Sequence, residues 1–236
     1  PSPFASQLGV FSTEIMDEAM VNSFIHKVFG LYRLFSVNLN KFNQIDRDLF
    51  HQKKQTTYEF DLIRNYRLIR EGYSQAIRSN IDKSKENNIS ILKGITPNEF
   101  LGFITQKGVM TSKTMNRRQL NKLRMIVAFV LKHGLGDIYA AYSGNNNLCA
   151  AIFFLRSNRK INILYSAVNS EGYASGATER IVDQYIQQHA EKNLTISFEH
   201  LAIPDRDAFC KGFGGNLYHY ITVSNPANIF MKKLFY

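Results

Sequence analysis

The N-terminal quarter of the chain alternates strand-like and helix-like patterns. Residues 7–11 and 32–39 are typical of strands, and residues 14–30 between them carry a helical pattern that Gly30 would end as a C-cap. Residues 40–55 are polar without clear periodicity, which favours an exposed loop. The pattern predicts strand, helix, strand and loop.

A strand and a helix are predicted next. Residues 57–62 alternate apolar and polar side chains, as a half-buried strand does. Four residues then fall at helical spacing in a segment reaching about residue 85: Tyr66, Ile69, Tyr73 and Ile77. A short strand at residues 89–92 follows the helix breaker Asn87-Asn88.

The following part predicts two helices and three strands. Thr96-Pro97-Asn98-Glu99 combines an N-cap, a proline at the first helical position and an acidic third residue, which marks a helix start. A second helix is predicted over residues 116–132. The three strands are predicted at residues 137–142, 148–155 and 161–168. Polar connections of four or five residues join them, which indicates antiparallel hairpins.

The last part alternates helices and strands. One helix carries its apolar face on Ile181, Val182, Tyr185, Ile186 and His189. A strand (194–198), a short helix (204–211), a strand (216–223) and a helix from Pro226 follow. The whole order predicts an α/β fold of the α+β type, with a mixed, mostly antiparallel central sheet flanked by helices.

Composition limits the class of protein. With 236 residues and 44% hydrophobic content, the chain suffices for one large domain or two modest ones. Cys149 and Cys210 are far apart, without metal-ligand spacing, and are expected to be buried thiols in a reducing compartment. No window resembles a membrane span, so we expect a cytoplasmic protein. Because metal-ligand spacing is missing, we expect no bound metal.

The formal net charge of +10 favours polyanionic partners, namely RNA, phosphate-rich cofactors or an anionic membrane surface. The densest basic run lies on the helix predicted at residues 116–132 and just before it: Lys113, Arg117, Arg118, Lys122 and Arg124. This basic run can be interpreted as a solvated helix face or as a binding surface.

One segment resembles a known family. Phe198-Glu199 at the end of a predicted strand, followed by residues 209–215 with Phe213-Gly214, resembles the signature that closes the acyl-transfer domain of FemAB-like proteins in the GNAT superfamily. Residues 58–62 and 73–84 are similar to the family's strand and basic helix. Where relatives have an aspartate before the motif and a Gly-Ser pair after it, this chain has Ser197, His200 and Leu201.

The resemblance implies a division into two GNAT-type lobes. Residues 1–87 would form a partial N-terminal lobe and residues 88–236 a C-terminal acyltransferase domain. Because related chains carry further residues before the segment matching residues 7–9, the first lobe is expected to be incomplete here.

The resemblance also implies a donor site. GNAT proteins hold acyl-CoA pyrophosphate on N–H groups at the start of the central helix. The matching residues here are Gly172, Ser175, Gly176, Ala177 and Thr178, although a plain capped helix start is an equal alternative. Backbone groups of Ala167, Val168 and Asn169 would face a pantetheine or aminoacyl chain where the strands splay.

For catalysis, Glu199 at the mouth of its strand is the expected base. His200 would share its work, and Tyr218 or Tyr220 on the next strand would act as the acid. The ordinary alternatives are a surface histidine and amphipathic strand tyrosines.

The expected function is transfer of an acyl group from acyl-CoA, such as acetyl-CoA, or of an aminoacyl group from aminoacyl-tRNA. The acceptor would be an amine of a small molecule or peptide. The alternative is a catalytically inactive GNAT-like binding or structural module, favoured by the altered motif.

Overall fold

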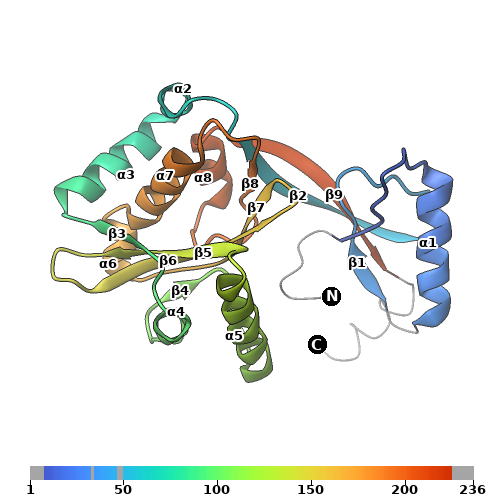
Figure 1. Cartoon of the computed structure of the whole chain (residues 1–236), viewed down its shortest axis with the longest axis horizontal. Helices are drawn as coiled ribbons and strands as arrows, with labels where there is room; N and C mark the ends of the chain where they lie inside the picture. Colours follow the sequence, from blue (N-terminus) through green and yellow to red (C-terminus); the bar gives the residue numbers. More distant parts are fainter. Residues whose placement is uncertain (1–7, 33–34, 47–49, 225–236) are drawn as a thin grey trace. The chain divides into compact units, whose positions relative to one another are not determined.

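A computed structural model describes residues 8–32, 35–46 and 50–224 of the chain (Figure 1). It divides into two compact units, each described here by itself. Unit 1 comprises residues 1–57 and 217–236, and unit 2 comprises residues 58–216. The boundary predicted between residues 87 and 88 falls inside unit 2, and the division into two lobes stays a prediction.

Unit 1 combines one helix, one whole strand and parts of two others. They are α1 (Glu18–Leu31), β1 (Ser36–Asn38), the first part of β2 (His51–Asp61) and most of β9 (Asn216–Ser224). β9 lies between β1 and β2, and it pairs antiparallel with β1. The core of the unit is formed by Val21, Ile25, Leu39, Ile45, Phe50 and Val223.

Several predictions for unit 1 are wrong in detail. Helix α1 begins later than expected because the Asp17 side chain accepts a hydrogen bond from the Met20 N–H and caps the helix there. Gly30 lies inside α1 rather than ending it. Residues 8–11 form no strand, and Gln7 lies outside the described residues. Residues 51–55, expected in a loop, belong to β2.

Unit 2 is built on a mixed sheet whose strands follow the spatial order β2-β8-β7-β6-β5-β3, with β4 against β7. The strands not yet given are β3 (Ser90–Lys93), β4 (Met110–Thr111), β5 (Gly136–Tyr142), β6 (Leu148–Ser157), β7 (Lys160–Val168) and β8 (Thr195–Ser197). The hairpins β5–β6 and β6–β7 are antiparallel, as predicted. Among the strand pairings described for this sheet, only that of β7 with β8 is parallel.

Helices cover both faces of this sheet. They are α2 (Tyr66–Glu71), α3 (Gln75–Glu86), α4 (Pro97–Ile104), α5 (Arg117–Lys132), α6 (Ser170–Ala174), α7 (Ala177–His189) and α8 (Arg206–Gly212). Figure 1 shows α3 and α7 on one face and α4 and α5 on the other. The mixed α/β fold with a mostly antiparallel sheet is therefore confirmed.

Local capping explains several helix boundaries. Thr96 caps α4 by accepting from the Glu99 N–H, and Asn116 forms a capping box with Gln119 at the start of α5. The segment expected to be helical up to residue 85 is instead two helices. α2 ends at Gly72, and Ser74 caps α3 through the Ile77 N–H.

Aromatic packing joins α7 to the sheet. The Tyr185 ring stacks on Phe154 of β6 with a centroid separation of 3.8 Å, and His189 stacks on Tyr185 at 4.1 Å. All three side chains are buried. This face of α7 is the one predicted from its apolar spacing.

Other predictions concern cysteines, the end of the chain, membranes and metals. Cys149 and Cys210 are both buried free thiols, as expected. The helix predicted from Pro226 lies outside the described residues. Within the described ranges, no helix is long and apolar enough to cross a membrane. The same residues contain no cluster of His, Cys, Asp or Glu able to hold a metal ion.

Candidate functional site

The candidate site lies where β7 and β8 diverge. The two strands pair in parallel over only three positions, from Lys160 opposite Thr195 to Asn162 opposite Ser197. The chain then leaves β7, because the Phe198 N–H donates to the Tyr58 carbonyl of β2 at 3.0 Å. Glu199 and His200 follow directly. The sequence motif therefore lies at a fork between strands, which we call the β7–β8 fork.

A serine that the sequence patterns did not single out connects the two arms of the fork. The Ser166 hydroxyl of β7 donates to the His200 carbonyl at 3.0 Å and accepts from the Ala202 N–H at 2.6 Å. Ser166 is only 2% exposed, so these two hydrogen bonds take the place of hydrogen bonds to water. The only signal in the sequence is one hydroxyl in an otherwise apolar part of β7.

Glu199 is held by neighbours on both sides of the loop. The Ser197 hydroxyl donates to Glu199 Oε1 at 3.3 Å, and Arg206 of α8 donates to the Glu199 carbonyl at 3.3 Å. The residue is only partly buried. A carboxylate that is held by hydrogen bonding and keeps partial access to solvent has the properties that a general base requires.

His200 is partly buried beside two cations. Burial, together with the charges of Lys113 and Arg206, lowers the pKa of His200 to about 4. The imidazole is therefore neutral at pH 7, and a group with so low a pKa is a weak base. This geometry suits His200 better to hydrogen bonding than to the shared proton removal expected from the sequence.

Tyr218, the expected acid, lies on β9 in unit 1. The Lys41 ammonium lies 3.8 Å from the centroid of its ring. Tyr220 lines a cavity of about 660 Å³ in the same unit, together with Lys41 and Gln52. Because Glu199 and His200 belong to unit 2, the role of Tyr218 in one site with them stays a prediction.

The backbone expected to receive a pantetheine or aminoacyl chain is already paired. Ala167 and Val168 lie opposite Ala151 and Ala150 of β6, and also opposite Thr111 and Met110 of β4. β4 thus pairs with the edge of β7 where the strands splay, and contact of these groups with a donor chain stays a prediction. The Asn169 N–H likewise donates to the Cys149 carbonyl at 3.0 Å.

The start of α7, expected to hold a pyrophosphate, is covered by α3. Gly176 has φ +72°, and a Cβ there would lie 2.3 Å from the Asn80 carbonyl oxygen of α3. Ala177 and Thr178 are buried. The Glu179 carboxylate accepts from its own backbone N–H and from the Asn80 side chain at 2.8 Å.

The Glu179 N–H at the helix start is thus occupied by a carboxylate of the chain itself. Burial raises the pKa of Glu179. Gly172 serves packing, since a Cβ there would lie 2.3 Å from the Cys149 carbonyl oxygen. The Ser175 hydroxyl donates to the Gly172 carbonyl at 3.2 Å. Whether these residues contact a donor stays a prediction.

Gly176→Ala should destabilise the protein by about 3 kcal/mol, because it adds a backbone clash to an unfavourable positive φ. Gly134→Ala is the matched control. Gly134 also has a positive φ, +63°, but a Cβ there meets nothing within 4 Å. The control should cost only about 1 kcal/mol. Equal urea midpoints for the two variants would contradict the close packing of α3 on α7.

His200 should make stability depend on pH. Its folded pKa of about 4 lies below the ordinary value of 6.5, so the unfolded chain binds more protons between these values. The stabilisation is therefore complete above pH 6.5 and is lost as the pH falls toward 4. Between pH 7 and 5 the loss should be about 2 kcal/mol.

Urea denaturation at both pH values measures this loss, and His200→Gln should remove it. His133→Gln is the control, because His133 is exposed, and its pH dependence should match that of the native chain. A pH dependence that persists unchanged in His200→Gln would show that His200 is not the titrating group.

Comparisons with known proteins identify the fold. No protein-family model matches the sequence, and no curated protein matches it significantly. Among solved structures, FemX is 10% identical with a TM-score of 0.58, over 87% of this chain and 77% of that chain. A conserved protein of unknown function from Bacteroides thetaiotaomicron VPI-5482 is 14% identical with a TM-score of 0.56, over 87% and 75%.

L-PGS from Bacillus licheniformis is 11% identical with a TM-score of 0.51, over 87% of this chain and 72% of that chain. At such identities the likeness concerns the fold and leaves the activity open. It agrees with the element order and with the motif at the β7–β8 fork. The chain therefore has a GNAT-like, FemX-like fold, and its tandem organisation stays a prediction.

Proposed function

We propose that this protein is an acyltransferase that moves an aminoacyl group from aminoacyl-tRNA to an amine, with Glu199 as the general base. The observation that carries the proposal is the position of Glu199 at the β7–β8 fork, fixed by Ser197 and by the Arg206 contact. The fold likeness to FemX supports the FemAB-like interpretation of the motif around Glu199.

The covered start of α7 favours aminoacyl-tRNA over acyl-CoA. The pyrophosphate of coenzyme A needs free N–H donors and a positive environment. Here the helix start is packed against Asn80 and faces the Glu179 carboxylate. An aminoacyl ester has no pyrophosphate of its own, and the phosphates of tRNA can bind surface cations of a chain with net charge +10.

The chemistry then requires one proton acceptor near the fork. Glu199 would take the proton from the acceptor's ammonium group, and the free amine would attack the ester carbonyl carbon. The new C–N bond forms as the C–O bond to the ribose breaks, and the ribose oxygen leaves with a proton. The neutral His200 imidazole beside Glu199 would orient groups by hydrogen bonding. General base catalysis of this kind typically contributes about 10²–10⁴-fold in rate.

The inactive GNAT-like module remains the second candidate. Leu201, in place of a small family residue, is 7% exposed and therefore fills space beside the fork. β4 closes the edge of β7 at Ala167 and Val168, so a chain that adds there would have to displace it. Both observations favour a module that binds but does not transfer.

Ligand binding distinguishes the donors. Charged tRNA should raise the melting temperature of the protein, whereas acetyl-CoA at the same multiple of a typical dissociation constant should not. Filter binding of charged tRNA should weaken steeply with salt, because bound counterions are released. Stabilisation by acetyl-CoA alone would overturn the choice of donor, and no response to either would favour the inactive module.

Glu199→Gln should reduce transfer by about 10²–10⁴-fold without weakening tRNA binding, because it removes the base but keeps the shape of the side chain. The measurement is single-turnover transfer of a labelled aminoacyl group to an amine acceptor. The acceptor is the amine, chosen from a test panel, that supports the fastest turnover. Glu86→Gln is the control, since it is the same substitution at an exposed position of α3. Undiminished transfer in Glu199→Gln would exclude Glu199 as the base.

A further inference from the structure

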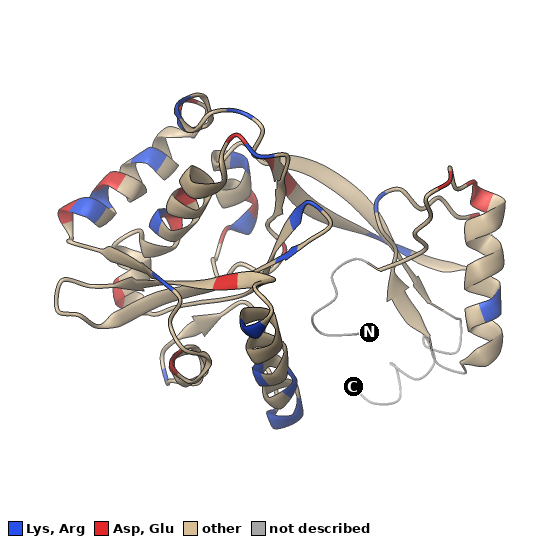
Figure 2. Ribbon diagram, viewed as in Figure 1, with Lys and Arg blue, Asp and Glu red and all other residues tan. Residues whose placement is uncertain are grey.

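The charge of unit 2 is concentrated on one helix and the segment before it. Residues 100–136 contain no Asp or Glu, but they contain seven basic residues: Lys107, Lys113, Arg117, Arg118, Lys122, Arg124 and Lys132. Five of these seven lie on α5. Figure 2 shows basic residues along α5 and no acidic ones.

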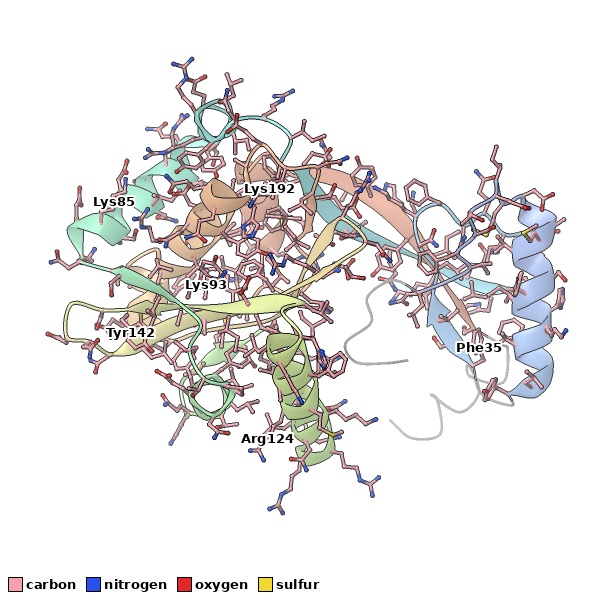
Figure 3. The ribbon with its side chains drawn as sticks, viewed as in Figure 1. Phe35, Lys85, Lys93, Arg124, Tyr142 and Lys192 are labelled. Atoms are coloured by element: carbon pink, nitrogen blue, oxygen red, sulfur yellow. The ribbon has the colours of Figure 1, made fainter. Side chains whose placement is uncertain are left out.

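Helix α5 buries one narrow stripe and leaves the opposite side to solvent. Its buried residues are Leu123, Val127 and Val130. On the opposite side, residues spaced by three and four form what we call the outer ridge of α5: Arg118, Lys122, Met125, Phe129 and Lys132. All five are exposed. Figure 3 shows side chains extending from this helix, with Arg124 labelled.

The cations of α5 differ from the other basic residues of unit 2. On α2 and α3, Arg67 pairs with Glu71 at 3.6 Å, and Asp82 pairs with both Arg70 and Lys85 at 3.5 and 3.0 Å. Arg118 and Lys122 form no ion pair with any residue in the described part of the chain. Their charge is therefore available to a partner.

The outer ridge also exposes large apolar side chains between its cations. Met125 is 71% exposed and Phe129 is 57% exposed. Binding to the phosphates of a nucleic acid would require only the cations of the ridge and would leave the apolar side chains unused. An anionic bilayer uses both kinds of residue, since Lys and Arg contact headgroups while Phe and Met enter the boundary with the acyl chains. Leu135, just beyond the helix, is 41% exposed and extends the apolar surface.

We propose that the outer ridge of α5 docks this protein on a membrane surface rich in anionic lipids. The helix lies along the surface, with Met125 and Phe129 inserted between headgroups and with Arg118, Lys122 and Lys132 on the lipid phosphates. This docking is independent of which acyl donor the protein uses. It assigns two residues of the basic run, Arg118 and Lys122, to a partner, in place of a merely solvated helix face.

The chain contains no tryptophan, so Phe129→Trp places a single fluorescent probe on the outer ridge. With vesicles of phosphatidylglycerol and phosphatidylcholine in equal parts, its emission should shift to the blue, and lipids brominated on their acyl chains should quench it. With pure phosphatidylcholine vesicles the emission should stay unchanged. No shift on the anionic vesicles would overturn the proposal.

Charge reversal tests the same surface in the otherwise native chain. Arg118→Glu with Lys122→Glu should lower the partition coefficient on anionic vesicles at least thirtyfold, because each basic residue near the surface contributes about fivefold and the introduced glutamates are repelled. Met125→Ala with Phe129→Ala should also weaken binding while leaving its dependence on salt unchanged. Sedimentation with vesicles measures both effects.

Arg67→Glu with Lys83→Glu is the matched control, because it changes the net charge equally on exposed positions of α2 and α3. The control should bind vesicles almost as tightly as the native protein. Equal losses in the control and in the α5 variant would show that net charge alone attracts the protein. Binding of RNA, but not of vesicles, that depends on Arg118 and Lys122 would assign the ridge to a nucleic acid instead.

Discussion

The structure of the candidate site depends on how β7 is paired. This strand contacts β6 along its length, β8 at its first residues and β4 at its last. Because the parallel pairing with β8 stops after three positions, the chain after β8 is free to turn and present Glu199. Ser166 then fixes that turn through the His200 carbonyl and the Ala202 N–H. Removing this hydroxyl would leave two buried polar groups without their partner.

The need to pair buried polar groups also governs the two places where the sequence predicts a coenzyme. A strand edge and a helix start both carry backbone groups that need partners. In a protein that binds coenzyme A, the ligand can supply them. Here β4 supplies them to β7, and the Glu179 carboxylate supplies one to α7. Both places therefore have partners supplied by the chain itself.

Charge adds a second level of organisation. Arg67 and Arg70 on α2 pair with nearby carboxylates, while Arg118 and Lys122 on the outer ridge of α5 form no ion pair within the part of the chain that the structure describes. A net charge of +10 says only that a polyanion is a suitable partner. The positions of Met125 and Phe129 among the cations make an anionic bilayer the better match for that helix.

The sequence by itself determined the features that depend on neighbours along the chain. Thr96 and Asn116 cap their helices as the local pattern indicates, the polar connections give hairpins, and the motif at Phe198-Glu199 ends a strand. The cap bonds span three residues, and the hairpins join strands that are consecutive in the chain, so periodicity, turn signals and capping chemistry are sufficient to predict them.

Only the tertiary structure decided the rest, because it depends on groups that are distant in sequence. Asn80 meets Glu179 across 99 positions, and Ser166 reaches Ala202 across 36. The two residues of β4 are too few to show a period, and the polar start of β2 becomes a strand through pairing with β9. The sequence indicated candidate residues for the chemistry, and long-range packing decided which contacts those residues make.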